Sequence, residues 1–198
     1  MAATPTTESP KIGRPRSAEA DAAITQATID LLATAGYAHL TMSGVAAGAG
    51  VSTATLYRRW SSKLELVVDV LGARADERPV PDTGSLAGDC RAFVANLVDA
   101  ARTTPVAPIM AGLVGEIGRN PELATALRTN LIGPRRAAFA EMLARAATRG
   151  ELRPGLDVDL VVDMLSGPIY HRLLITGGPV TPRVAGELAD LVLEAIAR

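Results

Sequence analysis

Residues 41–63 read TMSGVAAGAGVSTATLYRRWSSK, and this segment carries the strongest structural pattern in the chain. Thr41, Ser52 and Ser62 each precede a short run with apolar residues at helical spacing, and Thr and Ser are favoured helix N-caps. The glycines that follow the first run predict a tight turn. We therefore expect three short helices in one small module, over about 41–48, 52–59 and from 62 onward.

The first two of these helices share an apolar seam that lets them cross and pack together. Its members are Val45, Ala46, Ala49, Val51 and Leu56. This arrangement directs one polar face of the second helix outward, made by Ser52, Thr53, Thr55 and Arg58. A helix that presents such side chains and is held by its predecessor fits the major groove of DNA, so the segment predicts a helix-turn-helix. Trp60 is spaced with Leu56 and Leu64 and is expected in the core.

The residues before this module differ in character. Residues 1–10 are rich in Ala, Thr and Pro and are expected to be disordered, and a basic arm with Arg14 and Arg16 follows. Ser17 is the expected N-cap of a further helix, which Gly36 is expected to end. The arm either enters the minor groove of DNA or is a basic tail without a specific role, and the sequence leaves both open.

The composition of the chain favours an all-α fold. Hydrophobic residues make up 48% of the 198 residues but aromatic ones only 3%, which suits close-packed helices better than a β-sandwich or barrel. The formal net charge of −1 gives no general attraction for phosphate, so binding to nucleic acid requires local basic clusters. Arg58, Arg59 and Lys63 form such a cluster, with no acidic residue between Asp30 and Glu65.

Proline and glycine divide the rest of the chain. The segment 75–85 interrupts the helical pattern and is the expected domain linker. Helices are expected beyond it over about 86–102, 106–119, 122–131, 135–149, 158–176 and 182–197, about nine in the whole chain. The expected organisation is a disordered basic arm (1–16), a helix-turn-helix domain (17–63), a connecting helix (64–78) and a C-terminal ligand-sensing and dimerisation domain (79–198).

The motif in residues 41–66 resembles the TetR family of bacterial repressors. The matching positions are Thr41-xxx-Val45-Ala46-xx-Ala49-Gly50-Val51-Ser52-xxx-Leu56-Tyr57-xx-Trp60-xx-Lys63-xx-Leu66, after a first helix that ends in Gly36-Tyr37. The match covers roughly residues 17–70 without a gap.

The resemblance implies roles for individual residues. Thr41, Tyr57 and Lys63 become phosphate contacts, which suits a hydroxyl, a phenol and an ammonium. The candidates for base-edge or nearby backbone contacts are Ser52, Thr53, Thr55 and Arg58, of which the arginine is able to grip a guanine. Thr41 and Ser52 are alternatively caps alone, Tyr57 a packing aromatic, and Arg59 either a phosphate contact or a solvated charge.

Two apolar faces near the C-terminus predict a homodimer. A small helix-turn-helix makes few contacts with DNA, so useful operator affinity needs two copies about one helical turn apart. The resemblance implies that the last two helices meet their symmetry mates in a four-helix interface. The candidate interface residues are Val161, Leu165, Ile169, Leu173, Leu188, Leu191, Val192 and Ile196. The same faces would alternatively cover the core of the monomer.

The helices in between are expected to enclose a pocket for a small-molecule effector. The candidate lining residues are Phe93, Leu97, Met110, Leu113, Ile117, Met142 and Tyr170. Further candidates are Val114, Phe139 and Leu143, with Cys90, Glu116 and His171 as polar groups able to orient a ligand. A lining this apolar favours a hydrophobic or amphipathic ligand. Each residue is alternatively an ordinary member of the core.

These features together predict a sequence-specific transcriptional regulator, a repressor that a small ligand releases from a palindromic operator. Its expected partners are double-stranded operator DNA, a small-molecule effector and a second copy of the chain. We expect no cofactor, no metal and no membrane association, and a cytoplasmic location, because the sequence has no secretory signal and no charge-free run of about 18 apolar residues.

Two other classes of protein are alternatives, of which the sequence disfavours the first and operator selectivity distinguishes the second. An enzyme is opposed by the lack of a glycine-rich phosphate loop, by the placement of His39 and His171 in different expected domains, and by a lone Cys90 without an adjacent base. An architectural DNA binder would show little preference for one operator over random DNA. The sequence does not decide between repression and activation.

Overall fold

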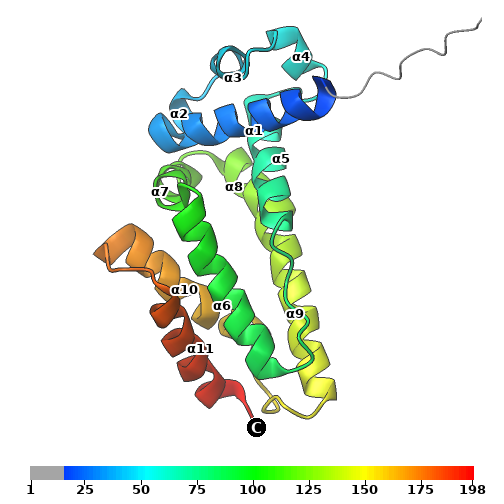
Figure 1. Cartoon of the computed structure of the whole chain (residues 1–198), viewed down its shortest axis with the longest axis vertical. Helices are drawn as coiled ribbons and strands as arrows, with labels where there is room; N and C mark the ends of the chain where they lie inside the picture. Colours follow the sequence, from blue (N-terminus) through cyan, green and yellow to red (C-terminus); the bar gives the residue numbers. More distant parts are fainter. Residues whose placement is uncertain (1–15) are drawn as a thin grey trace, which may run out of the picture.

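The computed structural model describes residues 16–198, and within this range every regular element is a helix (Figure 1). The N-terminal part contains α1 (Arg16–Thr34), α2 (Gly36–His39), α3 (Met42–Ala49), α4 (Thr53–Tyr57) and α5 (Lys63–Asp76). The remainder contains α6 (Leu86–Thr103), α7 (Val106–Ile117), α8 (Pro121–Leu127), α9 (Gly133–Thr148), α10 (Val158–His171) and α11 (Pro182–Ile196), with π-helical segments η1 (Arg128–Ile132) and η2 (Arg172–Thr176). The predicted all-α class is confirmed. No helix of the described range combines the length and apolarity needed to cross a bilayer.

Side-chain caps begin the short helices at the predicted residues. The hydroxyl oxygens of Thr41, Ser52 and Ser62 each accept a hydrogen bond from the backbone amide three residues later, at 3.0 to 3.2 Å. Each bond satisfies one of the amides that a helix N-terminus leaves without a partner. Local sequence therefore determines where α3, α4 and α5 begin.

Helix α1 differs from the expectation at both ends. It begins at Arg16, so Ser17 lies inside the first turn and is not the N-cap. Gly36 has a φ of +74°, which turns the chain as predicted, but the helix resumes at once as α2. A four-residue helix leaves too short a pattern to be predicted from apolar spacing.

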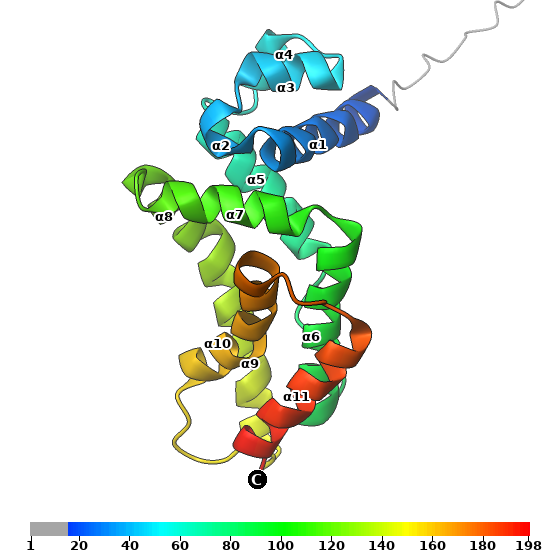
Figure 2. The ribbon, with the colours of Figure 1, turned by 90° about the vertical axis from the view of Figure 1, so that its left-hand side faces the viewer.

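Two clusters of buried residues stabilise the molecule, and they cross the expected domain boundary. The first joins α1 and α3–α5 with α7 and α8, which contribute Ile109, Leu113, Leu123 and Leu127. The second joins α6, α9, α10 and α11 around the rings of Phe93 and Phe139, which meet edge to face at 4.7 Å. Helices α7 and α8 are therefore the platform on which the N-terminal helices rest (Figure 2).

The expected break at Gly133-Pro134 is wrong. Helices α8 and α9 are joined through η1, a π-helical turn, and the amide of Gly133 bonds to the carbonyl of Arg128, five residues earlier. Proline lacks an amide and crowds the preceding carbonyls of an α-helix. A wider turn directly before Pro134 removes that conflict, so the helical path continues.

Candidate nucleic-acid interface and ligand cavity

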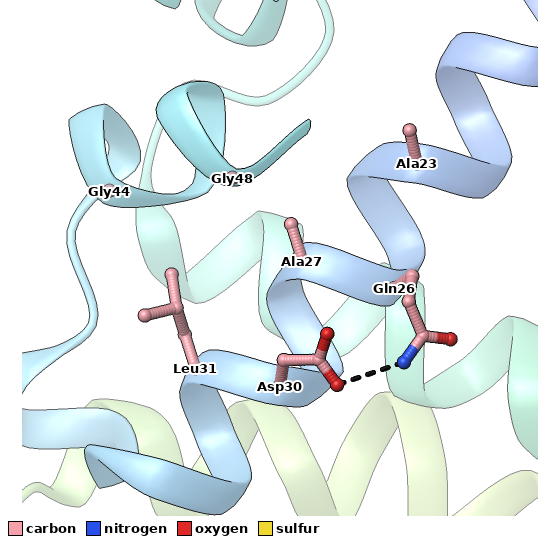
Figure 3. Close-up of a pocket in the computed structure, with 7 residues that line it drawn as sticks. All are labelled: Ala23, Gln26, Ala27, Asp30, Leu31, Gly44 and Gly48. Atoms are coloured by element: carbon pink, nitrogen blue, oxygen red, sulfur yellow. Dashed lines mark hydrogen bonds between the residues drawn. The ribbon is translucent and has the colours of Figure 1, made fainter. Parts of the chain in front are cut away.

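The close crossing of α1 and α3 positions the helix-turn-helix (Figure 3). Gly44 and Gly48 lie on the side of α3 that faces α1, next to Leu31 and Ala27. A Cβ added at Gly48 would stand only 3.1 Å from the Cβ of Ala27. Glycine costs a helix interior about 1 kcal/mol relative to alanine. Here the missing side chains allow the close approach of the two helices, with a shallow groove of about 380 Å³ between them.

Helix α4 presents its predicted recognition face to solvent at the end of the molecule that carries α3 and α4 (Figure 1). Ser52, Thr53, Tyr57 and Arg58 are exposed, Tyr57 with 57% of its surface, and Thr55 is half-buried. The hydroxyls of Ser52 and Thr55 also share a hydrogen bond of 2.9 Å. Leu56 is fully buried on the opposite side and holds α4 in the first core. The exposed residues thus stand on a helix whose orientation is determined by packing.

Arg59 and Trp60 connect the end of α4 to its neighbours. Arg59 forms an ion pair with Asp21 of α1 and lies over the ring of Trp60, with 4.3 Å between its Cζ atom and the ring centroid. Trp60 is buried, as predicted, and its Nε1 donates to a carboxylate oxygen of Asp69 in α5 at 2.9 Å. The guanidinium of Arg59, whose role the sequence left open, therefore has a protein partner.

Lys63 also has protein partners. Its ammonium donates to the carbonyl oxygens of Tyr37 and Ala38, at 3.0 and 3.2 Å, and stands 4.6 Å from the centroid of the Tyr37 ring. Both carbonyls belong to α2, so the first residue of α5 anchors a helix 25 residues earlier in the chain. An ammonium has three donors, which leaves one for a phosphate. No sequence pattern indicates this anchoring role, because α2 is itself too short to be predicted.

Three further DNA candidates are placed differently. Thr41 is exposed at the start of α3 while its oxygen caps that helix. Arg14 lies outside the described residues. Arg16 is the first residue of α1, and its side chain lies outside them as well. The structure therefore bears only on the first of the three.

A cavity of about 420 Å³ lies between the two cores, where α5, α6, α7, α9 and α10 meet. Six of the predicted ligand residues line it: Phe93, Leu97, Met110, Leu113, Ile117 and Tyr170. Phe139, Ile109, Leu127 and Leu131 extend the apolar wall. The volume falls in the range of about 300 to 1,000 Å³ that is usual for small-molecule sites.

Met142 is a correction to the predicted lining. Its side chain is fully buried in the second core and does not reach the cavity, because it lies on the side of α9 that packs against α6 and α10. The additional candidates Cys90, Val114, Glu116, Leu143 and His171 likewise do not line it. Burial raises the pKa of the Cys90 thiol to about 12, with a smaller contribution from Asp89, so this group is inert.

The polar part of the cavity wall was not predicted. It includes Arg74, Arg78, Arg135 and Arg136, from the end of α5, the segment after it and the start of α9. Burial raises the pKa of the Tyr170 phenol on the same wall, and the positive charge of Arg135 opposes that shift. Arginines at helix ends carry no sequence signal that distinguishes a cavity wall from solvent. The four arginines come together at the cavity only because α5 packs against the helices that follow it.

The predicted dimer residues on α10 and α11 are mostly core, which corrects that prediction. Val161, Leu165, Ile169, Val192 and Ile196 are at most 2% exposed and pack in the second core. Leu173 is half-buried and lines the cavity, and Leu188 is half-buried. Leu191 alone among the eight is exposed, at 65%. The five buried residues therefore follow the alternative that the sequence left open, in which they cover the core of the monomer, because α6 and α9 pack against this side of α10 and α11.

A second, outward side of α10 and of α11 is also largely apolar and remains uncovered in the single chain. The two helices lie side by side along the flank that faces the viewer in Figure 2. Their outward face, the α10/α11 face, combines exposed and half-buried residues: Leu160, Met164, Pro168, His171, Leu188, Leu191 and Ala195. Each of the two helices thus has two apolar stripes, and the presence of a second stripe in the sequence is the signal that could have indicated the outward face.

Comparison with known proteins agrees with both halves of the architecture. Residues 24–70 match the model of bacterial regulatory proteins of the tetR family, and residues 80–192 match that of the tetracyclin repressor-like C-terminal domain. The chain is 37% identical over 186 residues to the HTH-type transcriptional regulator YdeS of Bacillus subtilis, covering 93% of this chain and 92% of that protein. It is 34% identical to the DNA-binding transcriptional repressor TetR of Mycobacteroides abscessus, covering 89% and 93%.

Solved structures show the same fold. The TetR family transcription regulator SCO0332 is 37% identical, with a TM-score of 0.71 over 91% of this chain and 100% of that one. The regulator FadR of Bacillus subtilis, solved in complex with stearoyl-CoA, is 19% identical with a TM-score of 0.72, over 89% and 99% of the two chains, and shares the fold alone. These relatives are regulators and not enzymes, as predicted. The chain belongs to the TetR family of helix-turn-helix transcriptional regulators.

Proposed function

We propose that this regulator is a homodimeric repressor that binds a palindromic operator and is released by a small hydrophobic or amphipathic ligand. The observation that carries the proposal is the position of α5 and α7. Helix α5 leads from the helix-turn-helix to the cavity, and α7 forms both a cavity wall and the platform under α1 and α2. A ligand in the cavity therefore contacts elements that also support the DNA-binding end.

The proposed contacts to DNA lie on α4, at the residues next to the ends of α3 and α4, and at the start of α5. Ser52, Thr53, Thr55 and Arg58 are the candidates for bases and nearby backbone, and Thr41, Tyr57 and Lys63 for phosphates. The exposure of Thr41, Ser52, Thr53, Tyr57 and Arg58 at one end of the molecule supports this assignment. Thr55 and Lys63 are half-buried at the same end, and Lys63 has in addition its bonds to α2. Arg14 and Arg16 are proposed to add minor-groove contacts.

The α10/α11 face is the proposed dimer interface, in place of the buried residues. Leu160 and Leu191 are exposed large apolar side chains on neighbouring helices, and a two-fold axis beside them would bury both pairs. We expect Leu191→Glu to convert the dimer to a monomer. Val114→Glu is the matched control, because Val114 is 54% exposed but belongs to α7 and is not a residue of the α10/α11 face. Sedimentation velocity distinguishes the two states, and an unchanged dimer in the Leu191 variant would contradict the assignment.

Operator binding is tested by selection of bound fragments from a random duplex pool. The proposal expects an inverted repeat to be enriched. We expect Arg58→Ala to weaken binding to that repeat by about tenfold or more, since one bidentate base contact contributes about 1 to 3 kcal/mol. Arg128→Ala, an exposed arginine on η1, is the control and should bind as wild type. Failure to enrich any sequence would reject a specific operator.

A further inference from the structure

Among the residues that the structure describes, the charged side chains that line the cavity are all arginines: Arg74, Arg78, Arg135 and Arg136. Three of them are neutralised by carboxylates on the molecular surface. Arg74 pairs with Glu77 at 3.1 Å and Arg78 with Asp99 at 3.2 Å. Arg136 pairs with Asp159 and Asp163, both at 2.7 Å.

Arg135 differs from the other three. Its Nη1 donates to the carbonyl oxygens of Ala75 and Arg78, at 2.7 and 3.3 Å, and among residues 18–198 no carboxylate pairs with it. A guanidinium has five N–H donors, so donors on Nε and Nη2 remain for a ligand. Arg135 is half-buried, and its position is determined by its bonds to the chain at the end of α5. The cavity therefore contains one oriented positive charge without a counter-charge.

We propose that the cavity binds a small amphipathic anion, with its charged group on the guanidinium of Arg135 and the hydroxyl of Tyr170 and its apolar body against Phe93, Leu113 and Phe139. This inference rests on the proposed effector-binding role of the cavity and specifies the ligand class. Tyr170 and Arg135 both line the cavity. Burial raises the pKa of the Tyr170 phenol, and the positive charge of Arg135 opposes that shift.

Desolvation favours an anion over a neutral ligand. An apolar molecule that fills the cavity would remove water from the unused donors of Arg135 and leave them without acceptors, which is unfavourable. A carboxylate or sulfonate replaces that water with charge-assisted hydrogen bonds. The planar guanidinium of Arg135 has paired N–H donors that suit two oxygens of the same anionic group. A cationic ligand would be repelled. The apolar wall favours a ligand whose remaining surface is also apolar, because that surface is removed from water on binding.

The test uses two fluorescent probes with the same aromatic body. One is 8-anilinonaphthalene-1-sulfonate, an anion, and the other is N-phenyl-1-naphthylamine, which lacks the sulfonate. Titration of the full chain without DNA should give a Kd for the sulfonate that is at least about tenfold lower than that for the neutral probe, because hydrogen bonds to charged groups are the strong ones. Since no DNA is present, the result is independent of whether an operator exists.

Variants assign the preference to the proposed site. Arg135→Met should weaken the sulfonate by about tenfold or more and change the neutral probe by no more than about twofold. Arg135→Lys should recover part of the loss, and Tyr170→Phe should weaken the sulfonate alone. Arg128→Met removes the same charge outside the cavity and should leave the preference intact.

The outcomes that overturn the proposal are equally defined. Equal affinities for the two probes in the wild-type protein would overturn it, as would binding of neither. Persistence of the preference in Arg135→Met would place the anion elsewhere. Thermal unfolding of each variant shows whether the fold is intact, and if Arg135→Met fails to fold, the loss specific to the sulfonate in Tyr170→Phe decides the question. Enrichment of an operator by the same protein tests the repressor proposal separately.

Discussion

Replacing Lys63 by methionine separates the structural role of this residue from its proposed role at a phosphate. Methionine keeps most of the apolar stem but removes the ammonium that bonds to α2. The variant therefore deletes two hydrogen bonds and the cation over the Tyr37 ring. We expect a loss of folding stability that is present without any DNA.

The geometry gives the size of that loss. The bond to the Tyr37 carbonyl is partly buried and is counted near the lower end of the about 1.5 to 3 kcal/mol typical of a charged donor. The bond to the Ala38 carbonyl is exposed and contributes little. The ring of Tyr37 is buried, but the ammonium over it belongs to the half-buried Lys63 and stays partly hydrated, so this contact contributes about 0.5 kcal/mol. The expected destabilisation is about 2 kcal/mol, or a decrease in Tm of about 4 to 8 °C for a chain of this size.

Urea unfolding and operator titration over a range of salt concentrations measure the two roles. Arg58→Met is the control for the loss of a charge, because Arg58 is exposed, and its free energy of unfolding should change by less than about 0.5 kcal/mol. A phosphate contact by Lys63 would in addition make the salt dependence of log K less steep, by about 0.9 per subunit or about 1.8 for the dimer. Unchanged unfolding of Lys63→Met would refute the anchoring argument, whatever happens to DNA binding.

Three further predictions concern other parts of the chain. Gly48→Val should destabilise the fold by more than about 1 kcal/mol in urea unfolding, because the valine side chain would overpack against Ala27. Gly48→Ala should be nearly neutral, because the gain in helix propensity of about 1 kcal/mol offsets its tight contact with Ala27. Equal effects of the two substitutions would contradict the close crossing of α1 and α3. The Arg149 guanidinium and a backbone amide lower the pKa of the Glu151 carboxyl in the folded protein. The ionised carboxylate therefore stabilises the fold above the unfolded-state pKa, and this stabilisation is lost as the pH falls through the folded-state pKa. Glu151→Gln should be less stable than wild type at pH 7 but not at pH 3, and an equal difference in unfolding free energy at both pH values would refute the assignment. Alkylation of Cys90 by iodoacetamide at pH 8 should be at least about a hundredfold slower in the folded protein than in urea, because the thiol is buried with a pKa of about 12, and comparable rates would contradict its burial.

Local patterns determined what could be predicted from the sequence. The caps at Thr41, Ser52 and Ser62 involve atoms three residues apart, so residue type and position suffice to predict them. The core position of Trp60 follows from its spacing to other apolar residues of the same segment. The continuous path through Pro134 was not predictable in this way, because it depends on a π-helical turn that tolerates proline.

Five of the eight residues predicted at the dimer interface lie in the core for a different reason. Helix α10 is apolar on two sides, and the stripe that contains Val161, Leu165 and Ile169 is the one that faces the second core. Hydrophobic spacing identifies a stripe but does not identify its neighbour. The location of α6 and α9 over that stripe is tertiary information. The same limit applies to Met142, which is apolar and correctly spaced but lies on the wrong side of α9 for the cavity.

The position of the cavity gives the proposed release mechanism a defined physical basis. Ile109, Leu113 and Leu127 belong to the core of the DNA-binding end and also line the cavity, so a ligand there would contact side chains that pack beneath α1 and α2. Arg135 is bonded through Nη1 to the chain at the end of α5, so an anion on its remaining donors would be linked to that end of the helix through the guanidinium. A ligand shifts a conformational equilibrium only as far as it binds the two states differently. Contacts shared between the ligand and α5 supply such a difference, whereas a pocket enclosed by the second core alone would not.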